Sequence, residues 1–105
     1  MRFFTALALT LGLVIMGGSA LAHTPLFSCY DNGDGTVTCE GGFSDGSSAA
    51  GVAVHIFDGS GKVVKETKLD EFSELTFDKP AGDYSVQLDA GEGHRIDVSG
   101  GDIVE

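Results

Sequence analysis

Short stretches of alternating apolar and polar residues, separated by clusters of Gly, Asp, Asn, Ser and Pro, follow one another from residue 23 to residue 105. Because successive side chains of a β-strand point to opposite faces, this period of two predicts strands with one buried face each. No stretch of this part has the period of an amphipathic helix. About seven short strands at intervals of roughly ten residues are expected, and this spacing is typical of a small, all-β antiparallel sandwich.

The turn residues place the expected strands at residues 26–30, 36–43, 52–57, 62–69, 75–77, 84–88 and 96–98, with residues 103–104 extending the last one. In the third strand, Val54 and Ile56 take the more apolar face, so His55 is expected on the outer, partly exposed face. The fourth strand is polar, which predicts a position at the edge of a sheet. The whole pattern favours a sandwich of the immunoglobulin-like type.

Cys29 and Cys39 are the only two cysteines, and they flank the turn-forming residues 31–35. Asn and Asp tolerate left-handed backbone conformations and Gly adopts them without strain, so a hairpin is expected here. The two cysteines then lie opposite each other, and in an oxidising compartment they are expected to form a disulfide. The rival interpretation, a thiolate metal pair, is less favoured because the spacing is not that of a zinc knuckle and there is no second cysteine pair.

The first 22 residues have the organisation of a secretory signal peptide. Arg2 supplies a positive charge, residues 3–16 are an almost uninterrupted apolar run, and Ala20-Leu21-Ala22 is a small-residue cleavage site. The run is shorter than the roughly 20 apolar residues that span a bilayer. Residues 1–22 are therefore predicted to be removed. One domain, residues 23–105, is expected in the periplasm or secreted, with no direct membrane insertion after processing.

Charge excludes several classes of partner. Removing Arg2 from the six Lys/Arg leaves five against sixteen Asp/Glu, so residues 23–105 carry a net charge of −11 with neutral His. Nucleic acid and anionic lipid surfaces would both be repelled by such a domain. The acidity favours solubility and raises the local concentration of cations.

The sequence does not indicate an enzyme. No Ser, His and Asp set occurs in a recognisable context, and a sandwich of this size has little room for a substrate cleft. Residues 31–35 look like the start of a calcium-binding EF-hand loop. With Asp31 at the first position, however, the third and fifth positions are Gly33 and Gly35, which carry no carboxylate. The segment is interpreted as the hairpin turn.

Three histidines are the candidate metal ligands, and His23 has the most unusual position. The predicted cleavage makes it the mature N-terminus, where its α-amine and imidazole Nδ1 can close a six-membered chelate ring on one metal ion. Such nitrogen ligands suit copper, nickel, cobalt and zinc. The α-amine has a pKa of only about 7.7–8.0, so a metal displaces its proton near neutral pH. Pro25 restricts the backbone just after His23.

The other two histidines are His94 and His55. His94 lies in a Gly-rich, exposed turn at the start of a strand and is available as a third ligand. Asp89 and Glu92 flank it as candidate weak oxygen ligands or partners of the ring, but a simply solvated carboxylate is the favoured interpretation of each. His55 is expected in mid-strand, where an ordinary surface histidine is the favoured interpretation. It is kept as the reserve ligand candidate.

Several segments taken together resemble one family. They are the signal peptide with mature His23, GFSDG at residues 42–46, DGSGK at 58–62, TFDKP at 76–80 and DAGEGHR at 89–95. This order is similar to the small periplasmic accessory subunit of energy-coupling-factor nickel/cobalt transporters. The similarity covers most of residues 23–98, and its most specific part is AGEGHR with the N-terminal histidine.

The resemblance implies a transthyretin-like or carboxypeptidase-regulatory-like β-sandwich that handles Ni(II) or Co(II) for a membrane metal transporter. It also implies His23 and His94 as ligands. This chain departs from the family in three ways. Members typically continue into a C-terminal transmembrane helix that residues up to Glu105 do not include. The cysteine pair is not a feature of the family, and Phe72 and Ser73 stand where members have Gly. These departures favour a stand-alone periplasmic metal binder or metallochaperone.

The metal and the function class each keep an alternative. Resemblance favours nickel or cobalt, whereas the nitrogen ligands by themselves favour copper, which binds such sites most tightly among the divalent first-row ions. One alternative function is a structural or protein-interaction sandwich that binds no metal, in which His23 is incidental. The other is a small periplasmic copper enzyme, against which the short chain argues.

Overall fold

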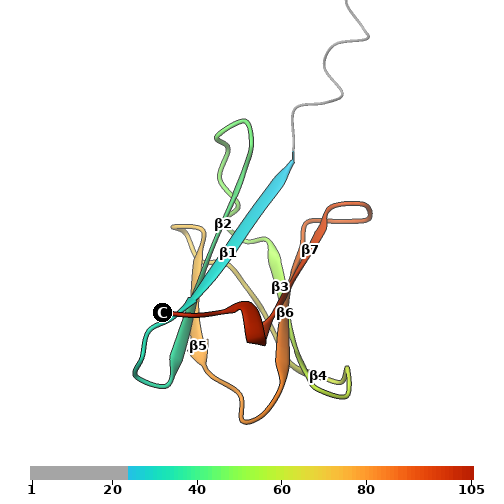
Figure 1. The fold of residues 1–105 in the computed structure, drawn as a ribbon. Coiled ribbons are helices and arrows are strands. Elements are labelled where there is room, and N and C mark those ends of the chain that lie inside the picture. The colour runs from blue at the N-terminus through green and yellow to red at the C-terminus, as the bar shows by residue number, and fades with distance from the viewer. Residues whose placement is uncertain (1–23) are drawn as a thin grey trace, which may run out of the picture.

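The computed structural model describes residues 24–105, so the predicted signal peptide and His23 lie outside the described residues (Figure 1). The described part contains seven strands and a short 3-10 helix: β1 Pro25–Asp31, β2 Thr36–Phe43, β3 Ala53–Asp58, β4 Val63–Lys68, β5 Glu74–Asp78, β6 Tyr84–Asp89, β7 Arg95–Ser99 and η1 Gly100–Asp102. The predicted all-β class and the number of strands are confirmed. No helix within residues 24–105 is long and apolar enough to cross a membrane.

The strands form two antiparallel sheets that pack face to face. One sheet has the order β1-β2-β5 and the other the order β4-β3-β6-β7. β1 lies against β7, so one lateral side of the sandwich is closed by strands from both sheets (Figure 1). β4 is the outermost strand on the opposite side of the second sheet, as its polar sequence predicted.

The core lies between the sheets and follows the alternation in the sequence. In β3, Val54 and Ile56 are buried while His55 is only partly buried, as expected. Their partners across the β3–β6 pair are Leu88 and Val86, which are also buried. Removing such a side chain from water contributes about 1.5–3 kcal/mol. The other members of the buried cluster are Val37, Cys39, Ala49, Leu69, Phe77, Tyr84 and Ile103.

The first hairpin has the predicted register and disulfide. Cys29 of β1 lies directly opposite Cys39 of β2, and the two are bonded. Cys39 is fully buried, so the disulfide faces the core and not solvent. The connecting turn uses Gly33 and Gly35 at positive φ (79° and 93°), which explains the glycines that resemble an EF-hand loop. A disulfide is consistent with a location outside the cytoplasm.

The expectation that residues 103–104 extend the last strand is wrong. β7 ends at Ser99 and η1 turns the chain away from the sheet. Ile103 then enters the core, and the carbonyl oxygen of Val104 accepts a hydrogen bond from the Asp31 backbone N–H at 3.0 Å. The Ile103 side chain and the Val104 backbone therefore hold this end of the chain beside β1, while the Val104 side chain is exposed. Two adjacent apolar residues show no period, so the sequence does not separate this arrangement from a strand.

The turn into η1 depends on a close contact between Gly100 and Tyr84, which predicts a position-specific effect of alanine. A Cβ atom on Gly100 would lie 2.6 Å from two ring carbons of Tyr84 and 2.7 Å from its backbone oxygen. We expect Gly100→Ala to lower the free energy of unfolding by about 1–3 kcal/mol. Gly101→Ala is the matched control, because its Cβ would meet only the Ser99 Oγ at 3.9 Å. Equal urea midpoints for the two variants would contradict the packing described.

Candidate functional site

The start of β1 is held in place by Ser44. The Thr24 backbone N–H donates to the Ser44 hydroxyl at 3.2 Å, and the Ser44 backbone N–H donates to the Thr24 carbonyl oxygen at 2.8 Å. His23, the first sequence-predicted ligand, lies outside the described residues. The residue that follows it is nevertheless fixed to the loop after β2 by two hydrogen bonds.

His94 lies in the turn between β6 and β7 and is exposed, as the Gly-rich sequence predicted. The turn is closed by hydrogen bonds from the Ala90 N–H to the His94 carbonyl oxygen and from the His94 N–H to the Gly91 carbonyl oxygen. Gly91 and Gly93 have φ values of 115° and 79°, where a side chain would be strained. These bonds give His94 a defined backbone position in spite of its exposure.

The ring of His94 has a specific orientation. Its Nδ1 lies 3.1 Å from the backbone carbonyl oxygen of Glu92. Because a carbonyl oxygen only accepts hydrogen bonds, Nδ1 must carry the proton in this contact. In the neutral ring, Nε2 then has its lone pair free on the exposed side of the turn. Metal-ligating histidines commonly have this arrangement, in which the second ring nitrogen donates to a carbonyl or carboxylate.

Two of the features singled out in the sequence lie at the same end of the sandwich. Figure 1 shows that β1 begins at the end where the β6–β7 turn lies, with β7 alongside β1. The strand order brings Thr24 and His94 to this common end, although 70 positions of the sequence numbering separate them. His55, in the middle of β3, belongs to a different part of the surface.

His55 takes part in a row of charged side chains on the outer face of the second sheet. Its Nδ1 lies 3.7 Å from a carboxylate oxygen of Glu66 on β4, and its Nε2 lies 3.4 Å from one of Asp89 on β6. Arg95 of β7 contacts the other oxygen of Asp89 at 3.2 Å. His55 therefore has a carboxylate at each ring nitrogen. This environment suits a polar cross-strand network better than a free metal ligand.

The favoured interpretation of Asp89 as a simply solvated carboxylate needs correction. Asp89 accepts a hydrogen bond from the Gly91 backbone N–H at 3.0 Å and is paired with Arg95 and His55. The Gly91 N–H, followed by Arg95, holds the pKa of Asp89 below its usual value. Glu92 contacts His94 through its backbone carbonyl and not through its carboxylate. Asp89 and Glu92 are close to His94 in the sequence. The direction of each side chain, however, depends on the cross-strand pairing, which sequence proximity does not give.

Within residues 24–105, no group of three or more His, Cys, Asp or Glu side chains could hold a metal ion. The geometry explains this for the most promising group. Glu66 and Asp89 approach opposite nitrogens of His55, so the three side chains do not converge on one point. Both cysteines are bonded to each other.

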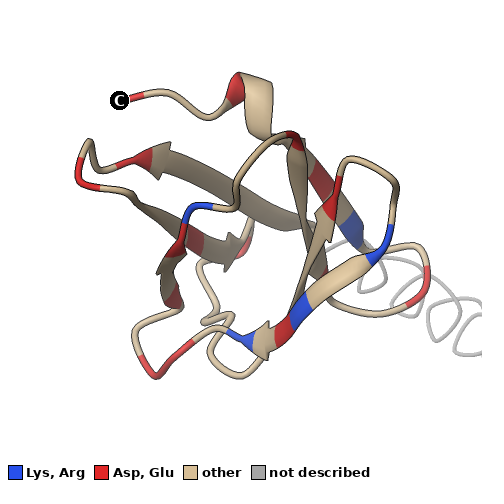
Figure 2. Cartoon of the chain, turned by 90° about the horizontal axis from the view of Figure 1, so that it is seen from below, with Lys and Arg blue, Asp and Glu red and all other residues tan. Residues whose placement is uncertain are grey.

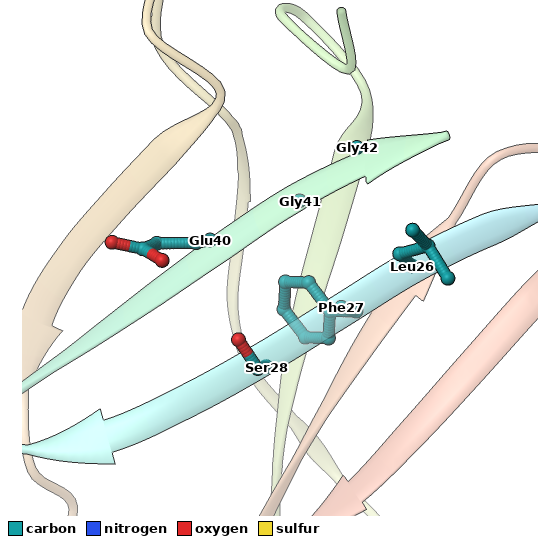
Figure 3. A pocket seen from close by; sticks show the side chains of 6 residues that line it. All are labelled: Leu26, Phe27, Ser28, Glu40, Gly41 and Gly42. Atoms are coloured by element: carbon teal, nitrogen blue, oxygen red, sulfur yellow. The ribbon is translucent and has the colours of Figure 1, made fainter. Parts of the chain in front are cut away.

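A shallow hollow on the β1–β2 hairpin was not predicted from the sequence (Figure 3). It has a volume of about 360 Å³ and is lined by Leu26, Phe27, Ser28, Glu40, Gly41 and Gly42. Gly42 is the cross-strand partner of Leu26, and a Cβ atom added to it would meet nothing within 4 Å, so no side chain fills the outer face at this position. Leu26 is 52% exposed at the rim of the hollow. A glycine within a strand is the sequence signal that could have indicated it.

A second hollow of about 530 Å³ lies beside η1 and is lined by residues that include Lys79, Tyr84 and Gly100. The Tyr84 hydroxyl is buried and has no hydrogen-bond partner among the described residues. Burial raises the pKa of this phenol above its ordinary value. Lys79, at the rim, is paired with Asp31 at 2.9 Å. The charge of Lys79 is thus paired with a carboxylate of the first hairpin.

Comparison of the chain with protein families, with curated proteins and with solved structures finds no match. The structure itself establishes the architecture, which is a small all-β protein with two antiparallel sheets of three and four strands. The transporter-subunit family suggested by the sequence segments is not identified by these comparisons.

Proposed function

We propose that the processed domain binds one divalent transition metal ion at the end of the sandwich where β1 begins. The His23 α-amine and imidazole are the first two ligands, and the Nε2 of His94 is the third. The role follows from the ligand set: a protein that offers three nitrogens leaves coordination positions open, so the ion can be passed on. Nickel or cobalt uptake or delivery beside a membrane transporter is the proposed context, with copper as the alternative ion.

The orientation of His94 is the observation that carries this proposal. Its Nδ1 donates to the Glu92 carbonyl oxygen at 3.1 Å, which leaves Nε2 as the nitrogen with a free lone pair. Of the two described histidines, His94 alone has an exposed ring nitrogen without a carboxylate beside it, because His55 has one at each nitrogen. The turn that carries His94 lies at the end where Thr24 begins β1 (Figure 1).

The hydrogen bonds of Thr24 restrict which nitrogens can serve as donors. The Thr24 amide donates its proton to the Ser44 hydroxyl, and a nitrogen that keeps its proton in this bond is not a metal ligand. The donors are then an amine and imidazoles, which bind as neutral groups. The α-amine has a pKa of about 7.7–8.0 and must lose its proton before it binds, so the affinity falls as the pH is lowered.

Calorimetric titration of the chain that starts at His23 tests this function directly. We expect one Ni(II), Co(II) or Cu(II) ion to bind with a dissociation constant of about 1 μM or less, equivalent to about −8 kcal/mol. A version with one alanine added before His23 should lose most of this affinity, because its α-amine is no longer on the same residue as the imidazole.

Two histidine variants of the same chain complete the test. We expect His94→Gln to weaken binding by about tenfold or more, or at least 1.4 kcal/mol. His55→Gln is the matched control and should bind as the parent does. Equal, weak binding by the native and alanine-extended chains would refute the N-terminal site. A structural or interaction role for the sandwich would then be the better interpretation.

A further inference from the structure

The strand β4 contributes no buried side chain to the core. Its six residues contain no buried side chain, and Val63 and Val64 are 41% and 51% exposed. Lys65 is the cross-strand partner of the buried Ile56, so it lies on the inward side of its sheet, yet it is exposed. The core therefore covers the inward face of the second sheet as far as β3, and β4 lies beyond the edge of the core.

The outer edge of β4 is open in the described part of the molecule. β4 pairs with β3 on one side and is the terminal strand of its sheet on the other. No backbone hydrogen bond from outside its own sheet is made to residues 63–68 within residues 24–105. A row of unpaired N–H and C=O groups on an edge strand is the template for adding another strand.

The charge of β4 is opposite to that of the rest of the domain. Of the five Lys/Arg that follow residue 22, Lys62, Lys65 and Lys68 lie at or within this strand, with Glu66 between the last two (Figure 2). Residues 62–68 thus carry +2. Since residues 23–105 carry −11, the remainder carries −13. An acidic partner is repelled by most of this surface and attracted by one strand.

A register shift in the β3–β4 pair adds an exposed apolar residue to this strand. Ile56 pairs with Lys65 and Phe57 with Val63, so Val64 is the extra residue of a bulge. Two adjacent valines are consequently exposed next to the lysines. Lysines and bulges on edge strands also prevent self-association, and here two β4 edges meeting would bring +2 against +2. The same lysines that repel a second copy attract carboxylates.

We propose that β4 is a docking edge for an extended, acidic segment of a partner protein, which adds as a fifth strand to the second sheet. Main-chain hydrogen bonds to the open edge supply affinity, and the lysines select carboxylate side chains. The exposed valines pack against apolar residues of the added segment. This inference does not depend on metal binding, since none of the proposed ligands lies on β4.

A capped peptide of alternating Glu and Val is a direct probe. Its binding to the processed domain can be followed by the amide NMR shifts of residues 62–68 and by fluorescence anisotropy. We expect the acidic peptide to bind and to shift the β4 amides, and a peptide with Lys in place of Glu to bind at least about tenfold more weakly. N-methylation of alternate peptide amides should remove binding, because it blocks strand addition. Raised salt should weaken it.

Matched double variants separate a local site from a general charge effect. We expect Lys65→Gln with Lys68→Gln to lower peptide affinity by about tenfold or more. Lys79→Gln with Arg95→Gln removes the same two charges from elsewhere and should change affinity by less than about threefold. The proposal is overturned by no binding of the acidic peptide, by equal binding of the N-methylated peptide, or by equal losses in both double variants. Sedimentation showing a dimer that β4 changes abolish would also overturn it.

Discussion

Replacing both cysteines by alanine is expected to lower the free energy of unfolding by about 2–3 kcal/mol, since the Cys29–Cys39 bond restricts a ten-residue separation in the unfolded chain. In a domain of this size that loss shifts the melting temperature by roughly 10–20 °C. The effect is large because such a domain has only about 5–15 kcal/mol of net stability. The bond also faces the core, where Cys39 is fully buried.

The measurement is urea unfolding of the oxidised chain, of the same chain with a reducing agent, and of the Cys29→Ala/Cys39→Ala variant. Reduction should destabilise the parent chain by a similar amount and leave the variant unchanged, which controls for effects of the reductant itself. A difference below about 0.5 kcal/mol between oxidised and reduced parent would show that the hairpin is already restrained without the bond.

The second large effect is expected from Leu88→Ala, which should lower the free energy of unfolding by about 2–5 kcal/mol. Leu88 is fully buried on β6 and lies opposite Val54 of β3. Truncation removes transfer free energy and leaves a cavity that neighbouring strands, tied by hydrogen bonds on both sides, fill only partly.

Leu26→Ala is the matched control for this change. The same atoms are removed, but Leu26 is 52% exposed on the outer face of the first sheet, at the rim of the hollow in Figure 3. We expect an effect within about 0.5 kcal/mol, as for most surface substitutions. Comparable losses in both variants, measured by chemical unfolding, would mean that the outer face of β1–β2 is covered by something other than solvent.

The local features of the fold were predictable because they depend on short-range physics. Alternation in residues 52–57 identified Val54 and Ile56 as buried and His55 as partly exposed. Gly33 and Gly35 predicted a tight turn, and that turn placed Cys29 opposite Cys39. Each of these conclusions uses only the period of a strand or the conformations open to Gly. None of them depends on where the other strands lie.

The pairing of distant strands was not predictable from the same patterns. β5 leaves its sequence neighbours β4 and β6 and pairs with β2 in the other sheet. β5 and β6 each present one apolar face, so alternation alone does not assign either of them to a particular sheet. Which edge β5 joins is decided by packing of the complete core. Residues 103–104 illustrate the same limit, because an apolar residue such as Ile103 can enter a core from a coil as well as from a strand.

By itself, the amino-acid sequence determined that this chain forms strands, where the chain turns, which cysteines pair and which faces are apolar, since alternation and turn residues act over a few residues. Only the tertiary structure decided that His94 presents Nε2 at the end where β1 begins, that His55 is flanked by Glu66 and Asp89, and that Lys65 is exposed although it lies on the inward side of its sheet. These properties arise from cross-strand register and sheet order, which bring together groups that are far apart along the chain.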